Sequence, residues 1–109
     1  MTSSYDKVNT KESLGINSTT VIDVFPTDFG CAAFFEYCVT ESGGNKRMGQ
    51  VYGVWDTLSA DFTDVSSPDL NGSTANFVWK LQINSGNVEL VSNILGGTWD
   101  VLVATRIIF

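Results

Sequence analysis

The stretch NFVWKLQINSGNVEL, residues 76–90, decides the class of fold. Apolar and polar residues alternate up to Ile83, and the alternation resumes at Val88 after an Asn-Ser-Gly-Asn turn. A period of two is typical of a β-strand with one buried face, and a turn rich in Asn and Gly is typical of a hairpin. We therefore predict a pair of antiparallel strands here. The expected core side chains of the first strand are Ala75, Phe77, Trp79, Leu81 and Ile83.

Most of the remaining chain repeats this pattern. Short segments rich in β-branched and aromatic residues are separated by turn residues such as Gly43-Gly44, Pro68 and Gly96-Gly97. No segment shows the apolar period of a helix. About seven strands with turns roughly every eight to twelve residues are typical of an antiparallel β-sandwich, so we predict an all-β fold of jelly-roll or immunoglobulin-like topology. The expected strands are 18–25, 31–40, 47–56, 60–65, 75–83, 88–91 and 98–109.

Residues 1–17 differ from the rest of the chain. They mix Ser, Thr, Asn and Lys and show no apolar period. We therefore predict an extended N-terminal arm at 1–17, outside the core, followed by one sandwich domain at 18–109. Such an arm can become ordered when it docks on a neighbouring protein. Its candidate contact residues are Tyr5, Val8, Leu14 and Ile16.

The charge of the chain argues against two classes of partner. The chain carries 12 acidic and 6 basic residues, a formal net charge of −6, and the basic residues are scattered. A nucleic-acid-binding surface needs clustered Lys and Arg, and an anionic membrane also attracts basic segments. No apolar run approaches the roughly 20 residues of a membrane-spanning helix, and the N-terminus has no secretory signal. We therefore expect neither nucleic acid nor a membrane as a partner.

The two cysteines do not form an obvious pair. Cys31 and Cys38 lie seven residues apart in one expected strand. At roughly 3.3 Å per residue they would be about 23 Å apart. A disulfide needs Cα atoms within about 7 Å. We therefore expect two free, packed thiols, which is consistent with synthesis in a reducing cytoplasm.

Residues capable of catalysis are few. The chain contains no histidine, so a nucleophile–histidine triad is impossible. The Gly-Gly pairs lack the lysine and the helix of a phosphate-binding loop. Four aspartates are candidates for the paired carboxylates of a glycosidase or for Ca²⁺ ligands, but their spacing matches no calcium loop, and acids in loops are usually solvated. These are Asp56, Asp61, Asp64 and Asp69. We expect no catalytic residue, no cofactor and no metal, and hence no enzyme.

Four aromatic residues have two interpretations, as core side chains or as platforms for sugar rings. They are Tyr52, Trp55, Trp79 and Trp99. Their positions in alternating strands favour the core. Tyr52 and Trp55 nevertheless point to opposite faces of the strand at 47–56, so only one of them can lie in the core of a two-layer sandwich. If the other is exposed, it marks a contact surface.

Five segments of residues 18–109 together carry a resemblance. They are VIDVF (21–25), EYCV (36–39), VYGVWD (51–56), GNVEL (86–90) and GTWDVLVATRII (97–108). Their order resembles a small β domain of virion structural proteins of tailed bacteriophages, particularly phages of marine and cyanobacterial hosts. The resemblance implies a fibre, spike or capsid-decoration module, commonly trimeric, made in the host cytoplasm and located on the virion. It carries over no catalytic residue.

Three functional hypotheses follow. The first is a capsid-decorating or cement protein that docks as a homotrimer on the major capsid protein. The apolar C-terminal residues 107–109 would be hidden in subunit contacts, because an exposed hydrophobic strand promotes edge-to-edge association. The second is a receptor-binding tip or short tail fibre attached by residues 1–17, and the third is a carbohydrate-binding module that recognises a host-surface glycan. The candidate contact residues outside the arm are Tyr52, Ile107, Ile108 and Phe109.

Overall fold

The computed structural model describes the backbone of residues 6–109 and the side chains from Asn9 onward. This part of the chain forms eight strands in two antiparallel sheets. It contains no helix that could cross a membrane. The prediction of an all-β antiparallel sandwich is confirmed. The strands are β1 (Asp6–Ile16), β2 (Thr20–Pro26), β3 (Ala32–Glu41), β4 (Lys46–Trp55), β5 (Ala60–Ser66), β6 (Phe77–Asn84), β7 (Asn87–Ile94) and β8 (Trp99–Ile108).

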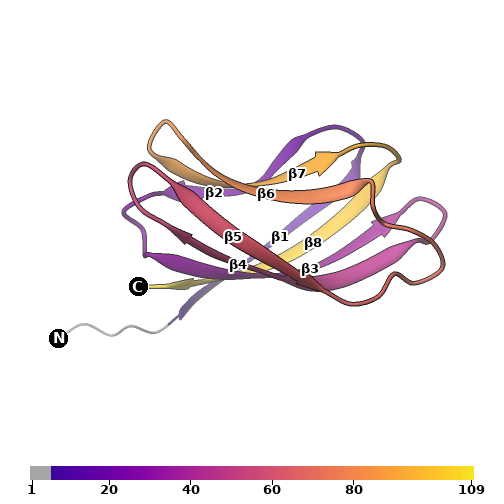
Figure 1. The fold of residues 1–109 in the computed structure, drawn as a ribbon, viewed down its shortest axis with the longest axis horizontal. Helices are drawn as coiled ribbons and strands as arrows, with labels where there is room; N and C mark the ends of the chain where they lie inside the picture. Colours follow the sequence, from indigo (N-terminus) through magenta and orange to yellow (C-terminus); the bar gives the residue numbers. More distant parts are fainter. Residues whose placement is uncertain (1–5) are drawn as a thin grey trace.

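The order of the strands separates the two topologies that the sequence leaves open. One sheet has the order β1-β8-β3-β4-β5 and the other has the order β2-β7-β6 (Figure 1). In an immunoglobulin sandwich the first two strands are neighbours in one sheet. Here β1 pairs with β8 and β2 pairs with β7, so consecutive strands cross from one sheet to the other at both ends of the chain. These outer strands wrap as in a jelly roll, whereas β3, β4 and β5 form a simple meander.

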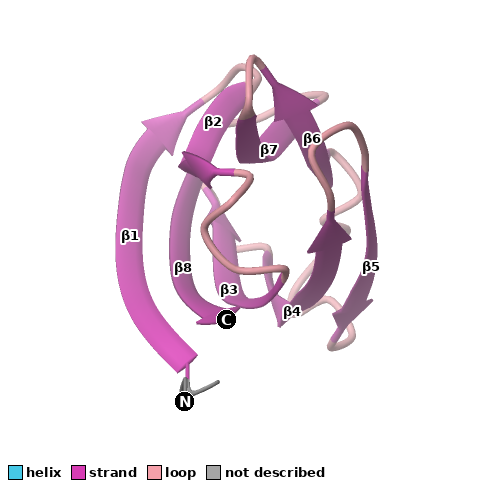
Figure 2. Cartoon of the chain, turned by 90° about the vertical axis from the view of Figure 1, so that its left-hand side faces the viewer, coloured by secondary structure: helices cyan, strands magenta, loops and turns pink. Residues whose placement is uncertain are grey.

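The five-stranded sheet curves around the three-stranded one. Seen from the end in Figure 2, it runs from β1 on one side, through β8, β3 and β4, to β5 on the other side. Strands β2, β7 and β6 close the top of this curve. The sandwich therefore has two flanks, one between β1 and β2 and the other between β5 and β6.

The core is built from the inward face of each strand. In β3 the alternate residues Ala33, Phe35, Tyr37 and Val39 are buried, and in β6 Phe77, Trp79 and Leu81 are buried. Their partners across the sandwich include Val88, Leu90, Trp99 and Val101, all fully buried. Full burial of one such aliphatic or aromatic side chain is worth about 1.5–3 kcal/mol. The predicted inward faces of these strands are therefore confirmed, except for Ala75, which lies outside β6 and is exposed.

Residues 6–16 of the expected N-terminal arm belong to the five-stranded sheet. These residues form β1, which pairs with β8 in a register that sets Asp6 opposite Ile108 and Lys11 opposite Val103. The sequence pattern hides this strand because its inward positions, such as Asn9 and Lys11, are polar and exposed. Edge strands with such residues need no apolar period. Residues 1–5, including Tyr5, lie outside the described part of the chain.

A bulge in β2 turns a carboxylate inward. The register with β7 shifts between Val21 and Asp23, so Ile22 and Asp23 are both buried although they are consecutive. The Asp23 carboxylate accepts a hydrogen bond from the Thr105 hydroxyl at 2.7 Å and another from the backbone N–H of Val24 at 2.9 Å. β-Bulges often re-aim a side chain in this way.

Candidate interaction surface

The outward side of the five-stranded sheet is unusually apolar. Val51 and Trp55 point into the core, so the side chains of β4 that alternate with them point outward. Among them Met48 is 60% exposed, Tyr52 43% and Val54 58%. Neighbouring strands add further apolar side chains on the same side. We call this surface the outer face and define it by Phe34, Met48, Tyr52, Val54, Val65 and Leu102.

Tyr52 forms part of a fixed aromatic pair on the outer face. Phe34 lies opposite it in the β3–β4 register, and the two rings meet edge to face with centroids 5.5 Å apart. Beside them Gln50 donates a hydrogen bond of 3.2 Å to the Glu36 carboxylate. A shallow depression of about 310 Å³ runs along this line from Glu36 to Val65. The surface thus combines rigid apolar area with a few polar groups, as protein–protein contact surfaces do.

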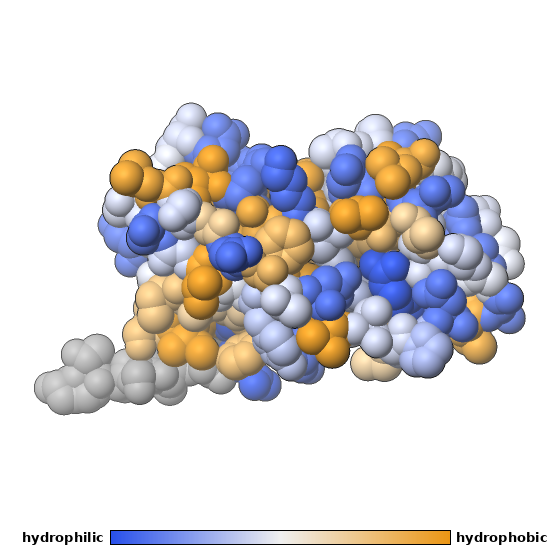
Figure 3. Space-filling view, in the orientation of Figure 1, coloured by the Kyte–Doolittle hydropathy of each residue, from blue (hydrophilic) through white to orange (hydrophobic). Residues whose placement is uncertain are grey.

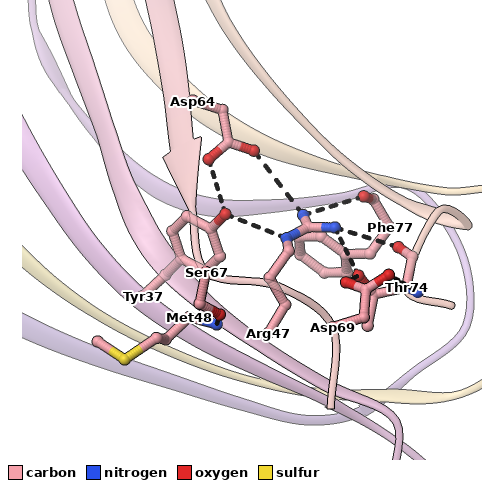
Figure 4. Close-up of polar contacts among 8 residues, drawn as sticks. All are labelled: Tyr37, Arg47, Met48, Asp64, Ser67, Asp69, Thr74 and Phe77. Atoms are coloured by element: carbon pink, nitrogen blue, oxygen red, sulfur yellow. Dashed lines mark hydrogen bonds and ion pairs between the residues drawn. The ribbon is translucent and has the colours of Figure 1, made fainter. Parts of the chain in front are cut away.

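The flank between β5 and β6 has a different surface. Figure 3 shows it with β5 toward the viewer, and its apolar side chains form separate groups among hydrophilic ones. One residue of β4, Arg47, closes this flank from the inside (Figure 4). Its side chain is only 10% exposed. Arg47 is one of the scattered basic residues of the sequence, and no motif around it indicates this role.

The Arg47 guanidinium holds the two sheets together. It donates hydrogen bonds to the backbone carbonyl and the hydroxyl of Thr74, at 3.2 and 2.9 Å, and to the backbone carbonyl of Phe77 at 3.2 Å. Its Nε donates to the Tyr37 hydroxyl at 3.2 Å, and its Nη2 lies 3.8 Å from the Asp64 carboxylate. These partners come from β3, β5, β6 and the turn before β6. We call this set of contacts the Arg47 cluster.

Tyr37 is held neutral in the Arg47 cluster. It donates a hydrogen bond of 2.7 Å to Asp64. Burial, followed by this hydrogen bond, raises the pKa of the Tyr37 phenol from 10.0 to about 12, and the nearby Arg47 opposes the shift. The phenol therefore acts as a hydrogen-bond donor at neutral pH and has no nucleophilic character.

The four candidate aspartates do not meet at one point: Asp56 and Asp61 line one shallow depression at the β4–β5 turn, and Asp64 and Asp69 lie elsewhere. Asp64 belongs to the Arg47 cluster, and Asp69 accepts hydrogen bonds from the hydroxyl and the N–H of Thr74, which lower its pKa. Asp56 caps the β4–β5 turn, and the N–H groups of Leu58 and Ser59 lower its pKa. Within residues 6–109 no group of three or more His, Cys, Asp or Glu side chains is placed to hold a metal ion.

The structure divides the candidate contact residues at the C-terminal end of the chain. Ile107 is buried in the core, so it is not available for a contact with another protein, and the prediction is wrong for this residue. Its inward position in β8, opposite Ala33, is the reason. Ile108 is half-buried on the outer side, and Phe109 is exposed with its ring against Phe29.

The candidates from the expected arm are also divided. Leu14 is exposed, whereas Ile16 packs against the core and lies opposite Trp99. The backbone of Val8 pairs with Arg106 of β8, and its side chain is outside the described part. Among the candidates whose side chains the structure describes, Tyr52 is a member of the outer face.

The predictions for the four aromatic residues are confirmed, and those for the two cysteines are confirmed in part. Trp55, Trp79 and Trp99 are core residues, and Tyr52 is the exposed member of its strand, as the alternation indicated. Both cysteines are free thiols. Cys38 is half-buried, but Cys31 is exposed and therefore not packed as expected.

Comparison with solved structures links the fold to tailspike proteins of Acinetobacter phages. The whole chain aligns with 23% of the tailspike of Acinetobacter phage vB_ApiP_P1, at 16% sequence identity and a TM-score of 0.55. For the tailspike of Acinetobacter baumannii phage AM24, the alignment covers 94% of this chain and 25% of that one, at 12% identity and a TM-score of 0.49. For the tailspike gp49 of Acinetobacter baumannii bacteriophage Fri1 the coverages are 94% and 18%, at 12% identity and a TM-score of 0.46.

These likenesses concern the fold, and the chain spans about a quarter or less of each tailspike. No protein-family model and no curated protein sequence matches the chain. The resemblance to phage virion domains is thus supported in part, because the similar folds belong to tailspikes, while the type found in marine and cyanobacterial phages is not supported. The Fri1 tailspike is described as a capsular polysaccharide depolymerase. The expectation that the chain is not an enzyme is therefore wrong as an exclusion, because one of the tailspikes with a similar fold has this description.

Proposed function

We propose that the protein is a module of a phage tail spike or short tail fibre. The observation that carries this proposal is the alignment of its whole length with part of one tailspike, at a TM-score above one half. The expected role as a capsid-decorating protein on the major capsid protein has no comparable support. The second of the three sequence-based hypotheses therefore takes precedence over the first.

We further propose that the module associates with copies of itself, as a homotrimer, through the outer face. The strands β3, β4 and β8 each have ten residues. With β5 beside them they span roughly 30 Å by 19 Å, or about 600 Å², at the usual strand rise and spacing. Specific interfaces bury about 800 Å² per partner, so the outer face supplies most of the area needed. The apolar side chains of the outer face occupy part of this area, beside polar ones such as Glu36 and Gln50, and contact surfaces commonly combine the two.

The oligomeric state tests the self-association. Light scattering on the purified chain is expected to give about three times its 11.8 kDa, or about 35 kDa. Val54→Lys places a charge on the outer face, near the end of β4, and is expected to give a monomer. Leu58→Lys is the matched control, because Leu58 is 86% exposed but lies in the β4–β5 turn. A monomeric wild-type chain, or an assembly unaffected by Val54→Lys, would contradict the proposal.

The position on the particle needs a separate measurement. Antibodies raised against the chain are expected to label the tail end of the virions that carry it, when these are viewed by electron microscopy. Label distributed over the capsid shell would restore the decoration hypothesis and exclude the tail spike.

A further inference from the structure

Strand β1 is held to the rest of the molecule mainly by its backbone. It is an edge strand of the five-stranded sheet and pairs with β8, in an antiparallel ladder that begins with Asp6 opposite Ile108. None of its described side chains, from Asn9 to Ile16, is fully buried, and of these Ile16 packs against the core. A segment with few buried apolar contacts can open locally at a low cost in free energy.

The connection from β1 to β2 has the features of a hinge. Residues 17–19 join the two strands, and all three are exposed. Just before them Gly15 has a φ of +66°, with open space where a Cβ would lie, and the register with β8 shifts between Ser13 and Ile16. Since β1 and β2 belong to different sheets, this short connection crosses from one sheet to the other (Figure 2). Short connections of this kind favour the exchange of a strand between copies.

The edge of β8 that β1 occupies lies beside the outer face. Leu102, which helps to define that face, belongs to β8, and Glu12 of β1 lies opposite it. A β1 strand supplied by a neighbouring copy would therefore continue the contact made by the outer face. Its eleven residues cover roughly 37 Å by 5 Å, or about 180 Å², at the usual strand rise and spacing. Added to the outer face, this area comes close to the roughly 800 Å² per partner that specific interfaces bury.

We propose that β1 is exchanged between copies of the chain, so that β1 of each copy pairs with β8 of the next. The inference rests on the proposed self-association through the outer face. Each copy gives its β1 to one neighbour and receives β1 from the other, a head-to-tail arrangement that closes into a ring of three. A second copy is the expected donor because its β1 reproduces every pair of the register, such as Thr10 opposite Ala104.

Disulfide trapping tests the exchange in the full chain. Thr10→Cys and Ala104→Cys together place two thiols at opposed positions, where paired Cα atoms lie about 4.5–5.5 Å apart, within the range of a disulfide. Cys31→Ser and Cys38→Ala remove the two natural thiols. After mild oxidation, exchange is expected to give a covalent trimer of about 35 kDa on a non-reducing denaturing gel, whereas pairing within one chain gives a band at 11.8 kDa.

The β6–β7 hairpin provides the matched control. Gln82 and Glu89 lie opposite each other in its register, and a turn of residues 85–86 keeps the two strands in one copy. Gln82→Cys with Glu89→Cys, in the same background, is therefore expected to give the 11.8 kDa band alone. A covalent trimer from this control would show that oxidation joins copies at random, and it would overturn the exchange inferred from the first pair.

A longer connection tests the hinge. Insertion of Gly-Ser-Gly-Ser between Asn17 and Ser18 gives β1 enough chain to pair with β8 of its own copy without the tight crossing. The yield of covalent trimer is expected to fall severalfold, and that of the oxidised monomer to rise. An unchanged yield would overturn the role of residues 17–19 as the hinge.

Light scattering on the unmodified chain separates this inference from the proposed function. A trimer in solution whose cysteine variant gives only oxidised monomers retains the self-association through the outer face and overturns the exchange. A covalent dimer retains the exchange and overturns the three-fold assembly. A chain that is monomeric in solution overturns both.

Discussion

The two flanks of the sandwich solve the same packing problem in opposite ways. Each is bounded by one edge strand of each sheet, β1 with β2 and β5 with β6. The β5–β6 flank is sealed by Arg47, whose charge is met by Asp64 and by carbonyl groups of the facing sheet. The β1–β2 flank has a buried carboxylate, Asp23, which accepts hydrogen bonds from the Thr105 hydroxyl and the Val24 N–H, beside a small pocket. In both flanks a polar side chain joins the two sheets, but the long arginine reaches partners on several strands, whereas the short aspartate reaches Thr105 of the facing sheet.

The largest expected effect on stability concerns the flank between β5 and β6. Arg47→Ala leaves Asp64 without its cation and the carbonyl groups of Thr74 and Phe77 without their donor. Arg47 donates four hydrogen bonds, and a hydrogen bond to a charged group contributes about 1.5–3 kcal/mol of unfolding free energy, so the loss is expected to exceed that of one neutral hydrogen bond. Urea denaturation should therefore show a strongly lowered midpoint, while Lys46→Ala, at the exposed neighbouring position, should leave it nearly unchanged. Equal midpoints for the two variants would show that the cluster does not hold the sheets together.

The second expected effect on stability concerns the flank between β1 and β2. Thr105→Val removes the hydroxyl that donates to Asp23 and keeps the shape of a fully buried side chain. A buried acceptor left without its donor costs about 1–3 kcal/mol. The same urea experiment should show a smaller loss than for Arg47→Ala. Thr63→Val, at an exposed position of β5, is the control, and an effect no larger than that of this control would mean that Asp23 draws its donors from elsewhere.

The third effect depends on pH and tests the Tyr37 phenol of the sealed flank. Its pKa is raised from 10.0 to about 12 in the folded chain, so the unfolded chain loses this proton first as the pH rises. The stabilisation is therefore complete below pH 10.0 and is lost between pH 10.0 and about 12. Tyr37→Phe should lower the stability at neutral pH and flatten this alkaline decline. An unchanged alkaline slope in the variant would assign the decline to other groups.

The smallest effect is expected at the β4–β5 turn, where Asp56 is exposed. The pKa of Asp56 is lowered from its ordinary value of 3.8 by the N–H groups of Leu58 and Ser59. Its contribution is thus present above pH 3.8 and is lost as the pH falls below it. Melting temperatures of Asp56→Asn are expected to depend less on acid than those of the wild type. If the melting temperatures of the two proteins fall equally as the pH is lowered, the Asp56 charge does not stabilise the turn.

The sequence predicted the elements whose two faces differ in polarity. Strands such as β3 and β6 alternate because one face meets the core, and the exposed position of Tyr52 follows from the same period. Strand β1 was not predicted, because its inward face borders the flank between β1 and β2 and is polar. A period-two pattern reports burial on one side, so it is silent where neither side is buried.

The buried contacts of Arg47 and Asp23 could not be predicted from the sequence for a different reason. Arg47 meets Thr74 and Phe77 across 27 and 30 residues, and Asp23 meets Thr105 across 82. No local motif encodes such encounters. In addition, the inward direction of Asp23 depends on a bulge that interrupts the alternation of β2. Both sets of contacts become visible when the register of the sheets is known.

The pairing of β1 with β8 has a consequence for how fast the chain folds. Asp6 lies opposite Ile108, so this ladder forms only when segments from the two ends of the polypeptide meet. Closing such a long loop costs conformational entropy before any hydrogen bond compensates for it, and folds dominated by distant contacts are slow. Linking Asp6 to Phe109 by a short turn, with residues 1–5 removed, and opening the chain between β5 and β6, which belong to different sheets, would turn this distant contact into a local hairpin and leave the other hairpins intact. The permuted chain should reach the same structure by a faster route.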